Sequence, residues 1–183
     1  MKTKICGITT QEQIDWINDL APAYIGFVFV KQSRRFVTME QALAMRVRVK
    51  DWQTETVGVF MNHSISEIVE ALPTFDMIQL HGNEDDDYIR NLREYTDSPI
   101  IKAFDLDHLT ATTADFVLID SPRAGSGQSF DWHRLQQVLA HSNDRSTDPL
   151  TCENIPNQPY FLAGGLTPDN IQVALEVLGN KPP

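Results

Sequence analysis

Short, continuous apolar runs alternate with segments of helical periodicity along the chain, and this alternation restricts the fold more than any other feature. The apolar runs lie near residues 2–8, 24–30, 56–61, 76–80, 99–104, 115–119 and 160–163. Segments with apolar residues at helical spacing lie near residues 9–20, 38–49, 64–71, 84–95, 130–140 and 167–178. Strands that are apolar throughout are typical of parallel sheets buried on both faces.

Repeated strand–helix units are compatible with two architectures, a (β/α)₈ barrel and an open doubly wound sheet. Polar or glycine residues follow five of the runs, at residues 6–7, 34–35, 81–82, 120–121 and 164–165. In a barrel all five positions lie on the rim that carries the active site, whereas an open sheet gathers only those near its switch point. The pattern therefore predicts an α/β fold of the (β/α)₈ barrel type, with about seven βα units in a single domain over residues 1–183.

Charge and composition restrict the class of partner. The 183 residues carry a formal net charge of −10, which argues against nucleic acid and leaves a small-molecule substrate. No apolar run has the length of a membrane span and no signal-peptide core follows Met1, so we expect a cytoplasmic protein without membrane contact. Cys6 and Cys152 are expected to be free thiols, although one disulfide is possible from the count. No Cys/His spacing predicts a metal site.

A strand, a Gly-Gly pair and a helix start follow one another at residues 160–170. Gly164 and Gly165 allow a sharp turn and a close approach of the backbone to a ligand. Thr167 is expected to cap the helix, with Pro168 at its first position. Such a turn presents backbone N–H groups to an anion, most often a phosphate, and a tight turn without a ligand is the alternative.

Cys6 and Asp120 are the candidates for acid–base chemistry. Cys6 ends a strand before a helix N-terminus, which favours a thiolate, and Lys4 projects from the same face of an ideal strand. The thiolate would be a nucleophile or a general base, whereas a buried structural cysteine is the alternative. Asp120 ends an apolar run, where partial burial favours the protonated form of a general acid. The alternative is a turn or N-cap aspartate.

Three further features fit an anionic substrate. Arg34 and Arg35 follow the second run, and an arginine binds a carboxylate through two parallel hydrogen bonds, although a solvated surface pair is the alternative. His81 is a candidate proton carrier or a structural histidine. The Gly-Ser-Gly segment at residues 125–127 either holds a phosphate or only turns the chain. Together these residues predict acid–base chemistry on a phosphorylated small molecule that carries a carboxylate.

Six motifs lie in order at six strand ends. They are KICGIT at residues 4–9, GFVF at 26–29 with SRR at 33–35, VGVF at 57–60 with Asn62, QLHG at 79–82, GSG at 125–127 with FDW at 130–132, and LAGGL at 162–166 with Pro168 and Asn170. In this order they resemble the phosphoribosylanthranilate isomerase family of tryptophan biosynthesis. One motif alone is unspecific, whereas six in order over the whole chain are specific.

This resemblance implies a (β/α)₈ barrel and a cofactor-free Amadori rearrangement. The substrate would be N-(5-phosphoribosyl)anthranilate and the product 1-(2-carboxyphenylamino)-1-deoxyribulose 5-phosphate. By resemblance, Cys6 is the general base that takes the proton from C2 of the ribose, and Asp120 is the general acid that protonates the ring oxygen. The resemblance assigns the anthranilate carboxylate to Arg35 and the phosphate to Gly164 and Gly165.

His81 is also predicted to be a substrate-binding residue. Three alternatives to the isomerase function remain. The family has an eighth strand and helix, whereas seven βα units are counted here, so an inactive barrel remnant or fragment that binds a sugar phosphate or a partner protein is the alternative function. A related histidine-pathway isomerase has an aspartate where Cys6 stands, which argues against that activity. No histidine is evidently placed to pair with Cys6 in a cysteine hydrolase.

Overall fold

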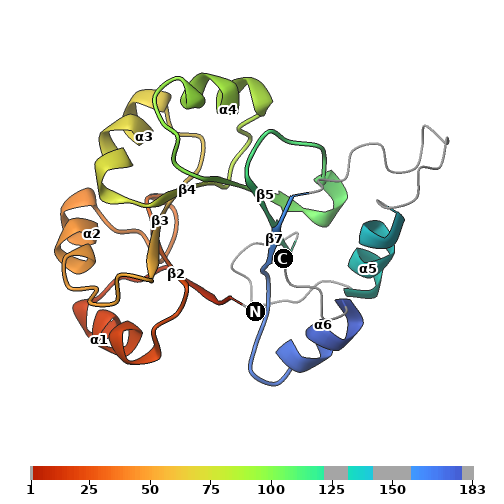
Figure 1. Cartoon of the computed structure of the whole chain (residues 1–183). Coiled ribbons are helices and arrows are strands. Elements are labelled where there is room, and N and C mark those ends of the chain that lie inside the picture. The colour runs from red at the N-terminus through yellow and green to blue at the C-terminus, as the bar shows by residue number, and fades with distance from the viewer. Residues whose placement is uncertain (1, 122–131, 142–157, 179–183) are drawn as a thin grey trace. The chain divides into compact units, whose positions relative to one another are not determined.

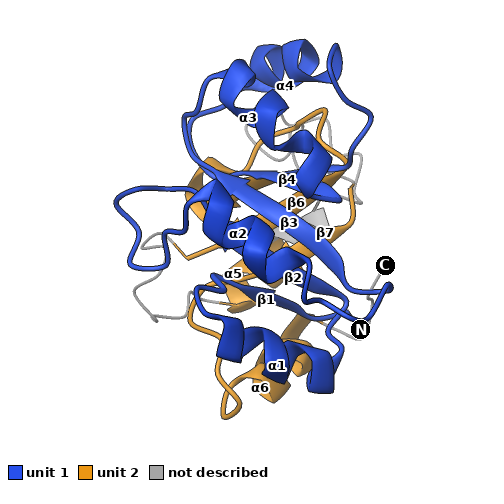
Figure 2. Cartoon of the chain, turned by 90° about the vertical axis from the view of Figure 1, so that its left-hand side faces the viewer, with its two compact units in different colours: residues 1–101 blue, residues 102–183 orange. Residues whose placement is uncertain are grey.

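The computed structural model describes residues 2–121, 132–141 and 158–178, in two compact units that comprise residues 1–101 and 102–183 (Figure 2). The described strands are β1 (Lys4–Cys6), β2 (Tyr24–Val28), β3 (Glu55–Phe60), β4 (Met77–Leu80), β5 (Ile100–Asp105), β6 (Phe116–Asp120) and β7 (Tyr160–Leu162). The described helices are α1 (Gln11–Leu20), α2 (Met39–Arg46), α3 (Ile65–Ala71), α4 (Asp86–Arg93), α5 (Trp132–His141) and α6 (Ile171–Leu178), with 3₁₀ helices η1 (Leu72–Thr74) and η2 (Leu106–His108). Within this described part, none of the helices combines the length and the apolar character needed to cross a membrane.

The strands of the first unit pair in the order of the sequence. β1 pairs with β2, β2 with β3 and β3 with β4, all in parallel, and Figure 1 shows helices α1 to α4 along one side of β2 to β4. In the two common doubly wound orders the β2–β3 and β3–β4 pairs do not occur together. The strand order of this unit therefore has the barrel-type succession that the sequence predicts.

Helices α1, α2 and α3 of the first unit begin at capping boxes. The side chains of Thr10, Thr38 and Ser64 each accept a hydrogen bond from the backbone three residues later, and the residue there bonds back to the cap. These contacts satisfy N–H groups that have no partner within a helix, so they fix where each helix starts. Leu20 is 68% exposed, because it is the last helical residue before the left-handed turn at Ala21.

The parallel register assigns the side chains of the first unit to two faces. Cys6 pairs with Gly26, and Gly26 pairs with Val57. Met77 continues this row on β4, and Gln79 follows it two residues later on the same face. Cys6 and Gln79 therefore share a face, although β2 and β3 lie between their strands.

Apolar side chains fill the opposite face of the same strands. Ile25 and Phe27 on β2 are fully buried. Beyond them, the rings of Phe29 and Phe60 stack at 5.1 Å between centroids, and the Phe75 ring lies 5.4 Å from that of Phe29. Aromatic pairs at this separation add to the stabilisation from burial, so the strand ends in this unit rest on a well-packed core.

The second unit is organised around the β6–β7 pair. The two strands are parallel, with Val117 opposite Tyr160 and Ile119 opposite Leu162. Val117 and Ile119 form a buried cluster with Leu135 of α5. This packing holds the end of β6, and with it Asp120, against the core of the unit.

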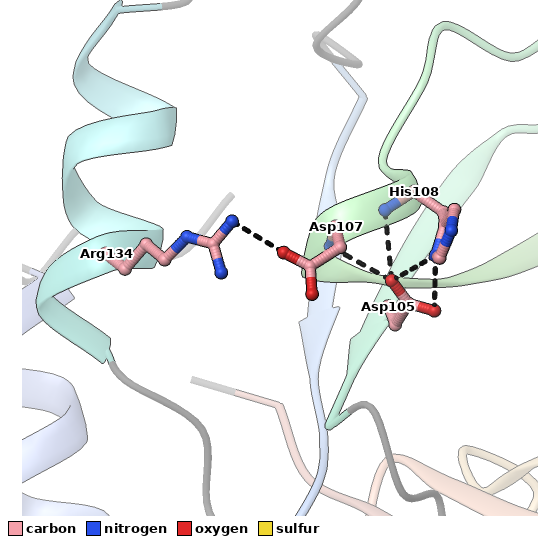
Figure 3. Close-up of polar contacts among 4 residues, drawn as sticks. All are labelled: Asp105, Asp107, His108 and Arg134. Carbon is pink, nitrogen blue, oxygen red and sulfur yellow. Dashed lines mark hydrogen bonds and ion pairs between the residues drawn. The ribbon is translucent and has the colours of Figure 1, made fainter.

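A polar cluster links α5 to the 3₁₀ helix that follows β5 (Figure 3). The Arg134 guanidinium lies 2.5 Å from a carboxylate oxygen of Asp107. Asp105 Oδ1 accepts hydrogen bonds from the backbone N–H groups of Asp107 and His108, at 2.9 and 3.0 Å. The hydrogen bond from the imidazole to Asp105 raises the pKa of His108, and the carboxylate charge acts in the same direction.

Helix α6 begins later than the sequence predicts. The regular helix starts at Ile171, and Pro168 lies in the preceding turn rather than at the first helical position. The carbonyl of Thr167 accepts from the backbone of Ile171 at 3.0 Å, and the side-chain oxygen of Asn170 accepts from the backbone of Thr167 at 2.8 Å. The Asn170 side chain thus holds the turn before α6 by accepting from a backbone N–H three residues earlier.

Some predicted features lie outside the described residues. These are the Gly-Ser-Gly segment at residues 125–127, the first residues of the FDW motif and Cys152.

Candidate active site

Cys6 ends β1 with its side chain against Gly26 of the neighbouring strand. A Cβ atom at Gly26 would lie 2.7 Å from the Cys6 Sγ. The backbone N–H groups of Gly7 and Ile8 both donate to the carbonyl of Gly26, at 2.8 and 3.1 Å, and Gly7 has a left-handed φ of 88°. Glycine at position 26 therefore makes the room in which the thiol lies, and the turn at Gly7 ends the strand directly after it.

Arg35 lies close to the same strand end. Its side chain runs over Gly7, so closely that a Cβ atom at Gly7 would overlap it. The Ser33 hydroxyl accepts from the backbone of Arg35 at 3.1 Å and shapes the loop that brings the side chain there. Arg34, the other candidate from the sequence, is exposed, as is Arg35 itself. The structure thus brings Arg35 next to the residue that follows Cys6.

His81 follows β4 and is hydrogen-bonded to a glutamine that the sequence analysis missed. The His81 Nδ1 lies 2.9 Å from the Gln79 Nε2, and the Gln79 Oε1 accepts from the Lys4 Nζ at 2.8 Å. Gln79 is 1% exposed. The available signal was a single amide inside an otherwise apolar run at residues 77–80, since a buried polar group needs partners.

A buried carboxylate holds the loop that follows His81. Glu84 accepts from the backbone N–H of Asn62 at 2.6 Å and from that of Gly82 at 2.8 Å. It thereby joins the loop after β3 to the loop after β4. Burial raises the pKa of Tyr88 to about 12, and the negative charge of Glu84 adds to this shift. The loop after β4 is therefore held to the loop after β3 by the hydrogen bonds of Glu84.

Asp120 ends β6 and lies against Gly164. The residue is 8% exposed, and its Oδ1 accepts from the backbone N–H of Ser121 at 2.7 Å. A Cβ atom at Gly164 would lie 2.8 Å from that same oxygen and 2.5 Å from the Ser121 nitrogen. The absence of a side chain at Gly164 therefore allows the end of β7 to approach the carboxyl group closely.

The turn after β7 is formed by the Gly-Gly pair, where the sequence predicts it. Gly164 and Gly165 both have a left-handed backbone, with φ of 84° and 64°. The side-chain amide of Asn170 donates to the carbonyl of Gly165 at 2.8 Å and holds the turn. The buried Ser121 hydroxyl nearby has no hydrogen-bond partner within the part of the chain that the structure describes. Backbone N–H groups in such a turn, together with a hydroxyl group, can bind a phosphate.

A buried lysine on β5 is a second residue that the sequence analysis missed. Lys102 is 5% exposed, and its Nζ lies 5.5 Å from the centre of the Phe104 ring, as in cation–π contacts. The signal was a cation within the apolar run at residues 99–104. Among the residues that the structure describes, His, Cys, Asp and Glu form no group of three or more that could hold a metal ion.

The predicted site residues fall into two groups, one in each unit. Cys6, Arg35 and His81 lie at strand ends or in the following loops of the first unit. Asp120 and the Gly164–Gly165 pair lie at the ends of β6 and β7 in the second. The first group offers a thiol, a guanidinium and an imidazole, and the second offers a carboxyl group and the Gly-Gly turn that is predicted to bind phosphate.

The family model of N-(5'phosphoribosyl)anthranilate (PRA) isomerase matches residues 3–182 of the chain. The chain belongs to the phosphoribosylanthranilate isomerase family. The family's isomerase from Endomicrobium trichonymphae is 36% identical over 186 residues, which cover 97% of this chain and 83% of the relative. The isomerase from Streptococcus pneumoniae serotype 19F is 37% identical over 180 residues, which cover 96% and 79%.

Solved structures of phosphoribosylanthranilate isomerases share the fold. The enzyme from Thermus thermophilus matches with a TM-score of 0.78 at 28% identity, over 97% of this chain and 83% of the other. The predicted α/β fold of the (β/α)₈ barrel type and the family resemblance are thereby confirmed. The roles of the individual site residues stay predictions.

Proposed function

We propose that the chain isomerises N-(5-phosphoribosyl)anthranilate to 1-(2-carboxyphenylamino)-1-deoxyribulose 5-phosphate, a step of tryptophan biosynthesis. The observation that carries this proposal is the match of the isomerase family over residues 3–182, which include all six candidate site residues. The proposal retains three predictions from the sequence: one barrel domain over residues 1–183, a cytoplasmic location, and a small-molecule substrate rather than nucleic acid, as the net charge of −10 favours.

The first chemical step is the opening of the ribose ring, for which Asp120 is the proposed general acid. The carboxyl group gives its proton to the ring oxygen, the bond from C1 to that oxygen breaks, and the nitrogen lone pair forms a C1=N double bond. The carboxyl group is 8% exposed at the end of β6, and a positioned carboxylic acid can give its proton to a reacting oxygen. The products of the step are an iminium and the Asp120 carboxylate.

The second step is the removal of the proton from C2, for which Cys6 is the proposed general base. The Cys6 thiolate takes the proton, and the electron pair of the C2–H bond forms a C1=C2 double bond as the iminium nitrogen becomes neutral. The resulting enaminol then loses the proton of its C2 hydroxyl and gains one at C1, which gives the ketone. The sum is a hydrogen shift from C2 to C1 with no net oxidation.

Substrate binding is assigned to residues at the ends of the strands. The Arg35 guanidinium would hold the anthranilate carboxylate through two parallel hydrogen bonds. The N–H groups of Gly164 and Gly165 would receive the phosphate. His81 would contact the substrate from the end of β4. These contacts place the two charged ends of the substrate and leave the ribose carbon atoms for Cys6 and Asp120.

Arg35→Ala tests the proposed substrate directly. We expect roughly a 10- to 100-fold increase in KM for phosphoribosylanthranilate, since a charge-assisted pair is removed. The same phosphoribosyl compound with aniline in place of anthranilate lacks only the carboxylate. Its turnover should therefore change little in the same variant. The measurement is the initial rate from the loss of substrate fluorescence, with product identity checked by chromatography.

Arg34→Ala is the matched control for this variant, because Arg34 is the adjacent arginine and is exposed as Arg35 is. Its KM should equal that of the unmodified chain. Equal losses in both variants, or an equal loss on both substrates, would contradict the assignment. The inactive-remnant interpretation predicts a folded chain with no turnover at any substrate concentration, so measurable isomerisation by the purified chain excludes it.

Gly26→Ala tests the placement of the Cys6 thiol. The added methyl group would lie 2.7 Å from Sγ, which is closer than van der Waals contact allows, so the thiol must move. A displaced reacting group is expected to lower kcat roughly 10- to 100-fold with little change in KM. Steady-state kinetics give both constants, and the thermal midpoint monitors the fold. A variant with an unchanged kcat would show that the thiol position is not critical.

A further inference from the structure

Lys4, Gln79 and His81 form one chain of hydrogen bonds with a defined direction. A lysine ammonium group has only donors, so the Gln79 atom that lies 2.8 Å from the Lys4 Nζ must be the carbonyl oxygen. The amide NH₂ of Gln79 therefore faces the His81 Nδ1 at 2.9 Å. Because that group only donates, Nδ1 must accept, which puts the ring proton of neutral His81 on Nε2.

This chain crosses the first unit from β1 to β4. Neighbouring strands lie 4.7–4.9 Å apart, so β1 and β4 would be about 14 Å apart in a flat sheet. The contact between Lys4 and Gln79 exists because the sheet curls and because both side chains project from the face of Cys6. The curl thus brings a cation from β1 onto an amide of β4, on the face that carries the proposed base.

Gln79 is buried among apolar side chains of β4, where an amide is costly unless it is satisfied. Both ends of its amide have partners, and both partners are less buried than the amide itself. An apolar residue at position 79 would fill the same space and would need no hydrogen-bond partners. The contacts therefore indicate a role in orienting the two neighbours rather than in packing alone.

We propose that Gln79 is a positioning residue of the isomerase: it holds the Lys4 ammonium on the face of Cys6 and fixes His81 as the Nε2–H tautomer. This inference rests on the proposed function, because the positioned groups would act in that reaction. The Nε2–H group is a hydrogen-bond donor, which matches a hydroxyl or carboxylate oxygen of the substrate. The Lys4 ammonium adds a positive charge to the same face, two residues before Cys6 on β1.

The tautomer of His81 provides a test that does not depend on turnover. Nitrogen NMR of the full chain with ¹⁵N-labelled histidine distinguishes protonated from unprotonated ring nitrogens, and a His81→Gln chain identifies the His81 signals. We expect Nε2 protonated and Nδ1 unprotonated in the unmodified chain. Gln79→Glu replaces the donor by a carboxylate that only accepts, so it should move the proton to Nδ1.

An unmodified chain with the ring proton on Nδ1 would overturn the proposal, and so would an unchanged His81 tautomer in folded Gln79→Glu. The first of these measurements needs no variant at the glutamine, so it holds even where Gln79→Glu folds poorly. Neither result depends on the substrate, so failure of the proposed function is seen separately, as absence of isomerisation by the unmodified chain.

A kinetic double-mutant cycle tests whether Gln79 acts through Lys4. Gln79→Met and Lys4→Met should each lower kcat roughly 10- to 100-fold, and the double variant should be no slower than the slower single variant, because both remove the same arrangement. Gln53→Met, at an exposed glutamine after α2, is the control and should match the unmodified chain. Fully multiplicative losses, or an unchanged kcat in Gln79→Met, would overturn the positioning role.

Discussion

Cys6→Ser is expected to lower kcat/KM for N-(5-phosphoribosyl)anthranilate by roughly 10²- to 10⁴-fold, the range that general-base catalysis contributes. A serine hydroxyl does not ionise near neutral pH, so it cannot take the proton from C2 as a thiolate does. The oxygen is smaller than sulfur and fits the space beside Gly26, where the thiol already lies. The loss should therefore appear in turnover and not in folding.

The matched control for Cys6→Ser is Cys152→Ser, which changes the other cysteine of the sequence in the same way. Its kcat/KM should equal that of the unmodified chain. Thermal midpoints of both variants show whether the fold is retained. If Cys6→Ser and Cys152→Ser had equal, undiminished activity, Cys6 would not be the base.

Asp120→Asn is expected to reduce kcat/KM by a similar factor, roughly 10²- to 10⁴-fold, because the amide has no acidic proton to give to the ring oxygen. The asparagine oxygen still accepts from the backbone of Ser121, and the group has the same size beside Gly164. Local geometry is thereby kept while the acid is removed. The measurement is the initial rate of substrate loss, normalised to folded protein.

Asp107→Asn is the control for the removal of a carboxylate from the second unit. Asp107 pairs with Arg134 on the surface, where the loss of an ion pair costs about 0–1 kcal/mol (Figure 3). Its kinetics should match those of the unmodified chain. Rates of Asp120→Asn and Asp107→Asn that differ less than tenfold would contradict the role of Asp120.

The parts of the site that follow from local pattern were predictable from the sequence. An apolar run that stops at Cys6, and another that stops at Asp120, put both residues at strand ends, where the structure has them. The Gly-Gly pair predicted a turn after β7, and both glycines have left-handed backbones. Periodicity and turn chemistry are short-range properties, so they can be read along the chain.

The contacts that cross the sheet were not predictable in this way. Strand alternation puts Lys4 on the face of Cys6, but nothing local to β1 identifies Gln79, 75 positions later, as its partner. That contact depends on the curl of the sheet and on the register of three strand pairs. The predicted start of α6 at Pro168 was wrong for a different reason: residues 168–170 form a turn, which the Asn170 side chain holds through the backbone N–H of Thr167.

The most direct test of the central claim, that Cys6 is the reacting base of an isomerase, is selective alkylation of the Cys152→Ser chain. Cys6 is then the single cysteine, and its modification by iodoacetamide can be counted by mass spectrometry beside the rate of phosphoribosylanthranilate turnover. We predict that turnover falls in proportion to the modified fraction and that the reaction product slows the modification. A chain fully alkylated at Cys6 that retained its turnover would contradict the account.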